Sequence, residues 1–190
     1  MLPSAAASLV VRPFRGYDAL ARARGEDAPT IAGGALRLLF VIGAVVATTA
    51  AGRLAPIELF VATFSFAYVP LAQLVAVTVA LRAVARDVPL RRAFALYLAG
   101  HGPWLIALLA IAAICLIAPS PAAVLFKVAP PLLLGTIAWG GVLTFACFRR
   151  GLALTAKRAG IATLLHTVVL TAIVVGYYLA MGQLGPQIWR

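Results

Sequence analysis

The chain has 190 residues, of which 64% are hydrophobic and only 11% are charged, and its mean hydropathy is +1.04. Soluble domains are about half apolar and about a quarter charged, so this composition excludes a soluble enzyme, a DNA-binding protein and a disordered tail. The formal net charge is +11, but the basic residues avoid the long apolar runs and form no groove for a nucleic acid. The composition indicates a polytopic membrane protein.

The first segment, residues 1–31, is expected to lie outside the membrane on the cytoplasmic side. Within it, Phe14, Tyr17 and Leu20 follow one another at i, i+3 and i+6, while Arg15 and Arg22 lie away from this stripe. This spacing predicts a short amphipathic helix that lies on the inner leaflet. The alternative is a docking helix for a cytoplasmic partner.

Five stretches without Asp, Glu, Lys or Arg follow, and one helix needs about 20 apolar residues to cross a bilayer. The sequence therefore predicts an all-α bundle of five transmembrane helices within residues 32–190, with spans at about 33–52, 58–81, 94–118, 128–148 and 160–181. Asp87 followed by Pro89 predicts an N-cap with proline in the first turn, so that the helix of span three begins in the preceding loop.

Basic residues are distributed unequally between the two sides of the predicted bundle. Thirteen of the sixteen precede or open span one, or lie between spans two and three or spans four and five, which leaves Arg53, Lys127 and Arg190 on the other side. By the positive-inside rule, the N-terminus is cytoplasmic and the C-terminus external. The 14 Arg, 2 Lys and 40 Ala are typical of a GC-rich bacterial gene, so we expect a bacterial inner membrane protein.

Two ridges of small residues, each with a spacing of four, indicate how the helices pack. They are Thr136, Gly140 and Thr144 in span four, and Thr163, Thr167 and Thr171 in span five. Helices in lipid associate through small residues and interhelical hydrogen bonds. We therefore expect the two ridges to pack against each other or against span two.

Proline recurs inside the spans, at Pro70, Pro103 and Pro130. Each proline frees a backbone carbonyl one turn earlier, which neighbours or water must satisfy, and such breaks line the binding sites of transporters. Gln73 lies one turn after Pro70, and we expect its amide to form a buried interhelical hydrogen bond. The alternative is a small-molecule or lipid transporter, or an auxiliary subunit of one, in which these residues frame a cavity.

Two histidines lie inside the spans, His101 nine residues after Arg92 and His166 eight residues after Arg158. Both helices enter the membrane from the same side, so the two imidazoles lie at a similar depth. Such a pair can be the axial ligands of haem in an electron carrier, or part of a metal site. Because no carboxylate lies within a span and neither cysteine lies at that depth, we expect no cofactor and no metal.

The acidic residues bear on catalysis and ion coupling, because both need ionisable groups in the membrane. All five lie in loops or at span ends: Asp18, Glu26, Asp27, Glu58 and Asp87. We therefore expect a non-enzymatic protein that binds lipids, other membrane proteins or a second copy of itself.

Several soft motifs and the five-span layout together resemble the Yip family, which is named for its interaction with Ypt/Rab small GTPases. Residues 13–17 read Pro-Phe-Arg-Gly-Tyr and precede the first span, as Pro-Phe segments do in bacterial members. The other matching features are Leu-Arg-Arg-Ala-Phe-Ala-Leu at 90–96, Gly-His-Gly-Pro at 100–103, Trp139, Gly-Leu at 151–152 and Lys-Arg-Ala at 157–159.

The resemblance implies a five-span fold with a cytoplasmic N-terminus and a role in membrane organisation or in assembly with other membrane proteins. The Asp-Leu-Tyr-Gly-Pro type of segment that precedes the first span of eukaryotic members is absent from this chain. The resemblance therefore does not extend to small-GTPase binding.

Overall fold

The computed structural model describes residues 8–23, 25, 28–51, 55–117, 127 and 129–188, and every regular element in these ranges is a helix. Five helical stretches are long and apolar enough to cross a membrane: Ile31–Thr48, Pro56–Val84, Leu90–Ile117, Pro130–Gly151 and Ala156–Ala180. The predicted all-α class and the five spans are confirmed, and the chain is a multi-pass membrane protein. The predicted span boundaries at 52, 118 and 128 lie outside the described residues.

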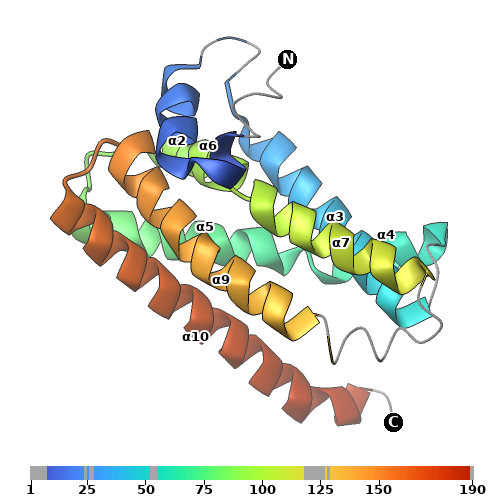
Figure 1. Cartoon of the computed structure of the whole chain (residues 1–190). Coiled ribbons are helices and arrows are strands. Elements are labelled where there is room, and N and C mark those ends of the chain that lie inside the picture. The colour runs from blue at the N-terminus through green and yellow to red at the C-terminus, as the bar shows by residue number, and fades with distance from the viewer. Residues whose placement is uncertain are drawn as a thin grey trace.

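Three of the spans are composite (Figure 1). A short helix, α2 (Pro13–Arg22), precedes the first span, which is the single helix α3 (Ile31–Ala51). The others are α4 (Pro56–Ser65) with α5 (Tyr68–Val84), α6 (Leu90–Ala99) with α7 (Gly102–Ile117), α9 (Ala129–Ala146) with the π-helical turn η2 (Cys147–Gly151), and α10 (Ala156–Ile188). We call the end that carries α2, the α5–α6 loop and the η2–α10 loop the basic end, and the other the opposite end.

Two spans are broken one turn before a proline. Pro70 has no N–H to donate, and its ring excludes the carbonyl four residues earlier from the helical pattern. That carbonyl, on Phe66, accepts a hydrogen bond from the backbone N–H of Val69 at 3.0 Å instead. The break between α6 and α7, at Gly100 and His101, has the same relation to Pro103.

The third span begins in the loop, at Leu90, but its cap differs from the predicted one. Pro89 occupies the N-cap position, and no side chain caps the helix. Asp87 lies in the turn before it, so the expectation that Asp87 is the N-cap is wrong. Proline has no side-chain acceptor, and the first backbone N–H groups of α6 therefore lack a capping partner within the described chain.

Packing is concentrated at the basic end. Its core includes large side chains with 1% exposure or less from four segments: Leu9, Tyr17, Val77, Leu81 and Phe148. A second buried cluster, toward the opposite end, has only Ile111 and Cys115 as its buried members among the described residues. The helices are therefore fixed to one another chiefly at the basic end.

The N-terminal helix α2 forms as predicted, but its apolar face packs on the bundle. Tyr17 is 1% exposed and Leu20 is 7% exposed, because η2 and α9 cover this face of the helix. Phe14 meets Phe145 edge to face, with ring centroids 6.2 Å apart. The expectation that this stripe rests on lipid is therefore wrong, since protein covers most of it.

Candidate functional site

The two intramembrane histidines both contact one tyrosine. The ring centroid of Tyr97 is 5.1 Å from that of His101 and 5.0 Å from that of His166. Phe148 contacts His166 from another direction, at 6.4 Å between ring centroids. All four side chains are buried, with 7% exposure for His101 and 4% for His166. We call Tyr97, His101 and His166 the histidine–tyrosine centre.

Three features of the chain and its fold bring these side chains together. Tyr97 and His101 are four residues apart, so they lie on one face of the third span. His166 comes from α10, which packs along α9 and η2 as well as α5. The π-helical turn places Cys147 and Phe148 in the core, where both are 0% exposed.

Tyr17 attaches α2 to this centre. Its hydroxyl occupies the position that a Cβ atom on Gly100 would take, and its ring carbon Cζ would be 3.1 Å from such an atom. The hydroxyl also lies within hydrogen-bonding reach of the Cys147 thiol. Burial, and secondarily the neighbouring Cys147, raise the pKa of Tyr17 well above its usual range, so Tyr17 is neutral at physiological pH.

A small cavity of about 30 Å³ lies beneath Tyr17, with room for about two water molecules. Its lining includes Tyr17, Tyr97, His101, Trp104 and Thr144. Nδ1 of His101 is buried and has no hydrogen-bond partner in the structure. A water in the cavity would have polar partners on several sides, as buried waters need.

Three further buried polar atoms have no hydrogen-bond partner within the described residues: Oε2 of Glu58, Oε1 of Gln73 and Nε2 of His166. An unsatisfied buried acceptor costs about 1–3 kcal/mol. The interhelical hydrogen bond expected of Gln73 is therefore not made through this oxygen. The structure leaves the predicted polar residues inside the bundle, but it does not pair them with one another.

The centre does not have the shape of a haem site. Tyr97 contacts both imidazoles, and the adjoining cavity is about 30 Å³, whereas sites for ligands and cofactors have roughly 300 Å³ or more. Within the described chain, no three His, Cys, Asp or Glu side chains are grouped so that they could hold a metal ion. The cavity beside these histidines is therefore smaller than a haem site.

The two predicted small-residue ridges lie apart from each other. Gly140 faces α7, since a Cβ atom there would be 3.0 Å from Nε1 of Trp104. In α10, Thr167 and Thr171 are exposed, although Thr163 is half-buried and donates its hydroxyl to the carbonyl of Ala159 at 2.8 Å.

The remaining predicted positions are the threonines of span four and the three prolines. The hydroxyls of Thr136 and Thr144 donate to carbonyls of their own helix, at 2.7 and 2.9 Å. Pro70 is buried, Pro103 is half-buried and Pro130 is exposed. None of these prolines, nor Gln73, lines the cavity beneath Tyr17.

Sequence reasoning missed Tyr17, Tyr97 and Cys147 as members of the site. The four-residue spacing of Tyr97 and His101 was a readable signal. The π-helical turn that turns Cys147 inward has no comparable signature in the sequence.

The fold and composition define a multi-pass membrane protein with five helical spans. Comparisons with protein-family models, with curated protein sequences and with solved structures found no match to this chain.

Proposed function

We propose that this chain is a non-enzymatic, Yip-like protein of the bacterial inner membrane that acts by assembling with other membrane proteins. Its N-terminus and basic end lie in the cytoplasm, in keeping with the positive-inside rule. Described residues of the basic end include twelve Lys and Arg but only two acidic residues, Asp18 and Asp87. Small GTPases are not among the proposed partners.

The exposed face of α10 is the observation that supports this proposal. Only 17% of the apolar window of this span is buried inside the chain, against 39% in each of the first two spans. Thr167 and Thr171 lie one turn apart on the exposed face, beside the large apolar side chains of Leu164 and Val168. Thr and other small residues favour contacts between helices in lipid, so this face suits a partner helix.

A test of the proposal is native mass spectrometry after extraction in a mild detergent. The wild-type chain is expected to carry a stoichiometric protein subunit, and Thr167→Leu/Thr171→Leu to lose it, because the larger side chains keep a partner helix at a distance. Ala113→Leu/Ala138→Leu is the matched control, since both alanines are exposed on other spans. A wild-type chain without any subunit, or equal retention by both variants, would refute the proposal.

Lipid or small-molecule transport is a second candidate, favoured by a groove between α3 and α4. The groove has a volume of about 530 Å³ and mostly apolar walls, and Glu58 also lines it. Oε2 of Glu58 is buried without a hydrogen-bond partner among the described residues, which suits a zwitterionic or cationic amphiphile. Specific flux into liposomes that contain the purified protein, lost in Glu58→Gln, would support transport over assembly.

A further inference from the structure

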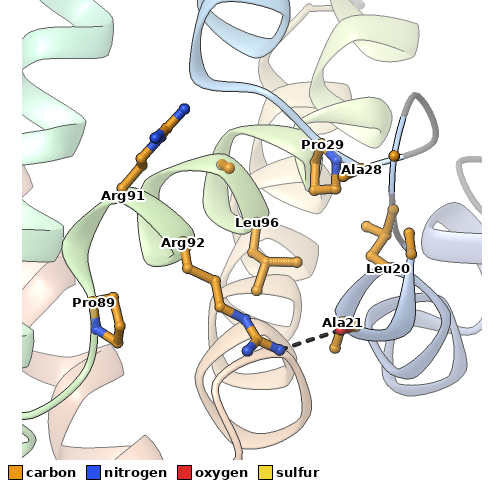
Figure 2. Close-up of a pocket in the computed structure, with 11 residues that line it drawn as sticks. Leu20, Ala21, Ala28, Pro29, Pro89, Arg91, Arg92 and Leu96 are labelled. Carbon is orange, nitrogen blue, oxygen red and sulfur yellow. Dashed lines mark hydrogen bonds between the residues drawn. The ribbon is translucent and has the colours of Figure 1, made fainter.

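A cavity of about 480 Å³ opens between α2 and the first turns of α6 at the basic end (Figure 2). Its walls are mostly apolar: Leu20, Ala28, Pro29, Ala95 and Leu96 contribute to the lining, and Pro89 borders it at the start of α6. The cavity is distinct from the small one beneath Tyr17 and belongs to a different face of α6. Its volume lies within the range of ligand sites, roughly 300–1,000 Å³.

Two arginines, Arg91 and Arg92, line this otherwise apolar cavity. Figure 2 shows Arg92 extending across it to α2, where it donates a hydrogen bond to the carbonyl of Ala21 at 3.2 Å, while Arg91 points away from Ala21. A guanidinium has five donors, so Arg92 retains most of its hydrogen-bonding capacity. Arg91 has no hydrogen-bond or ion-pair partner among the described residues.

The start of α6 is an unfavourable position for positive charge. Arg91 and Arg92 lie in the first turn of α6, where the helix dipole disfavours positive charge. This turn has no acidic residue and no side-chain cap. None of the described lining residues is acidic, so the positive charge in the cavity is left uncompensated by them.

We propose that this cavity binds the phosphate headgroup of an anionic membrane phospholipid. Guanidinium groups bind phosphate through paired, charge-assisted hydrogen bonds. The apolar walls beside them suit the glycerol and the first acyl carbons, because the cavity lies where the apolar spans end and the headgroups of the bilayer begin. Basic clusters at this depth bind anionic lipids.

We favour a lipid as the occupant because one amphiphilic molecule can contact both the arginines and the apolar walls of the cavity. A free phosphate would satisfy the arginines but leave Leu20, Leu96 and Ala95 facing water. A neutral lipid would cover these walls but would supply no net negative charge to neutralise the two guanidinium groups. The inference does not depend on the assembly role of α10, which lies on another surface.

The test measures lipid retention by the purified full-length protein in mild detergent, by native mass spectrometry with added phosphatidylglycerol or phosphatidylcholine. Arg91→Gln/Arg92→Gln is expected to retain phosphatidylglycerol about 30-fold more weakly, which corresponds to about 1 kcal/mol per arginine at an anionic surface. Lys157→Gln/Arg158→Gln is the matched control, because it removes two exposed charges from the same end and is expected to retain wild-type binding.

A second variant tests whether the space in the cavity is needed, independently of its positive charge. Ala95→Phe keeps both arginines and fills the cavity, so it is expected to lose phosphatidylglycerol as well. Thermal unfolding in detergent verifies that each variant is folded, so that loss of lipid in a folded variant reports the site.

Four outcomes would overturn the proposal. Equal loss in the two charge variants would assign binding to the basic end as a whole, and displacement by inorganic phosphate at equal affinity would assign it to a free anion. Equal retention of phosphatidylcholine would show that the charge has no role. Absence of binding by the wild-type chain, with binding gained in Glu26→Gln/Asp27→Asn, would show that acids of the chain itself neutralise the arginines.

Discussion

Gly100→Ala tests whether Tyr17 fixes α2 to the bundle. The backbone at Gly100 has φ −74° and ψ 0°, a conformation that alanine adopts without strain. The added methyl group would overlap the Tyr17 hydroxyl and lie 3.1 Å from Cζ of the same ring. Tyr17 is 1% exposed, so its ring has little room to move away.

The expected loss of stability follows from two opposing contributions. Inserting a methyl group into a well-packed core costs about 1–3 kcal/mol, while replacing glycine by alanine in a helical conformation contributes about 0.5–1 kcal/mol of stability. The net result is a destabilisation of about 0–2.5 kcal/mol. Gly160→Ala is the control, because a Cβ atom there has no neighbour within 4 Å, and it should be neutral or stabilising.

Two measurements separate detachment of α2 from general unfolding. Thermal unfolding in detergent gives the overall change, and the rate of tryptic cleavage at Arg15 and Arg22, both exposed on or beside α2, reports how often the helix opens. In Gly100→Ala, cleavage should accelerate more than overall unfolding does. Tyr17→Phe in the same background removes the overlapping oxygen and should restore part of the loss.

The result that would refute this reasoning is a Gly100→Ala protein as stable and as resistant to trypsin as Gly160→Ala. Such a protein would place the Tyr17 hydroxyl away from Gly100. Strictly additive effects of Gly100→Ala and Tyr17→Phe would lead to the same conclusion, because residues in contact show coupling energies.

Three further expectations concern the same end of the molecule. Burial raises the pKa of Tyr17 above its unfolded value, so the contribution of Tyr17 to stability is full below about pH 10 and falls by about 1.4 kcal/mol per pH unit above it. Fluorescence of Trp139, whose indole N–H donates to the carbonyl of Val10 at 3.1 Å, should report the release of the N-terminal segment at alkaline pH. Tyr17→Phe should abolish this change. Cys147 is 0% exposed and should react with maleimide only as fast as the protein opens; rapid labelling of the intact protein would contradict the packing. Haemin added to the purified protein should give no Soret band of a six-coordinate haem, since Tyr97 contacts both imidazoles, and such a band would contradict this geometry.

The spans could be predicted from the sequence because the bilayer imposes a simple rule of length and polarity. The breaks were also readable, since the chemistry of Pro70 and Pro103 acts one turn earlier whatever the fold. The sequence could not predict which helix, or whether lipid, covers a given helix face. The apolar stripe of α2 has the same pattern whether lipid or protein covers it, and only the structure shows η2 and α9 against Tyr17 and Leu20.

The candidate site, too, could be predicted from the sequence only in part. Equal depth of His101 and His166 follows from counting residues from the basic loops, and the structure brings both to Tyr97. Counting could not show that Tyr97 contacts both imidazoles, because rotation of each helix about its axis is set by packing. The small-residue ridges left their partners open for the same reason, since a ridge specifies close approach but not the helix that approaches.

At the opposite end, α3 and α4 approach each other closely at Gly43 and Thr63. Gly43→Ala therefore tests whether the two ends of the molecule are independent. A Cβ atom at Gly43 would lie 3.0 Å from Cβ and 3.1 Å from Cα of Thr63, so the methyl group must push α4 away from α3. Overpacking costs about 1–3 kcal/mol and replacing glycine by alanine within a helix contributes about 0.5–1 kcal/mol, so we expect a net cost of about 0–2.5 kcal/mol. Tryptic cleavage in α2 should not accelerate, because the clusters at the two ends share no buried residue among those described. In the double variant with Gly100→Ala, the two losses should add within about 0.5 kcal/mol. A larger coupling energy would show that the breaks at Pro70 and Pro103 transmit strain along the spans, and that the opposite end responds to whatever binds the basic end.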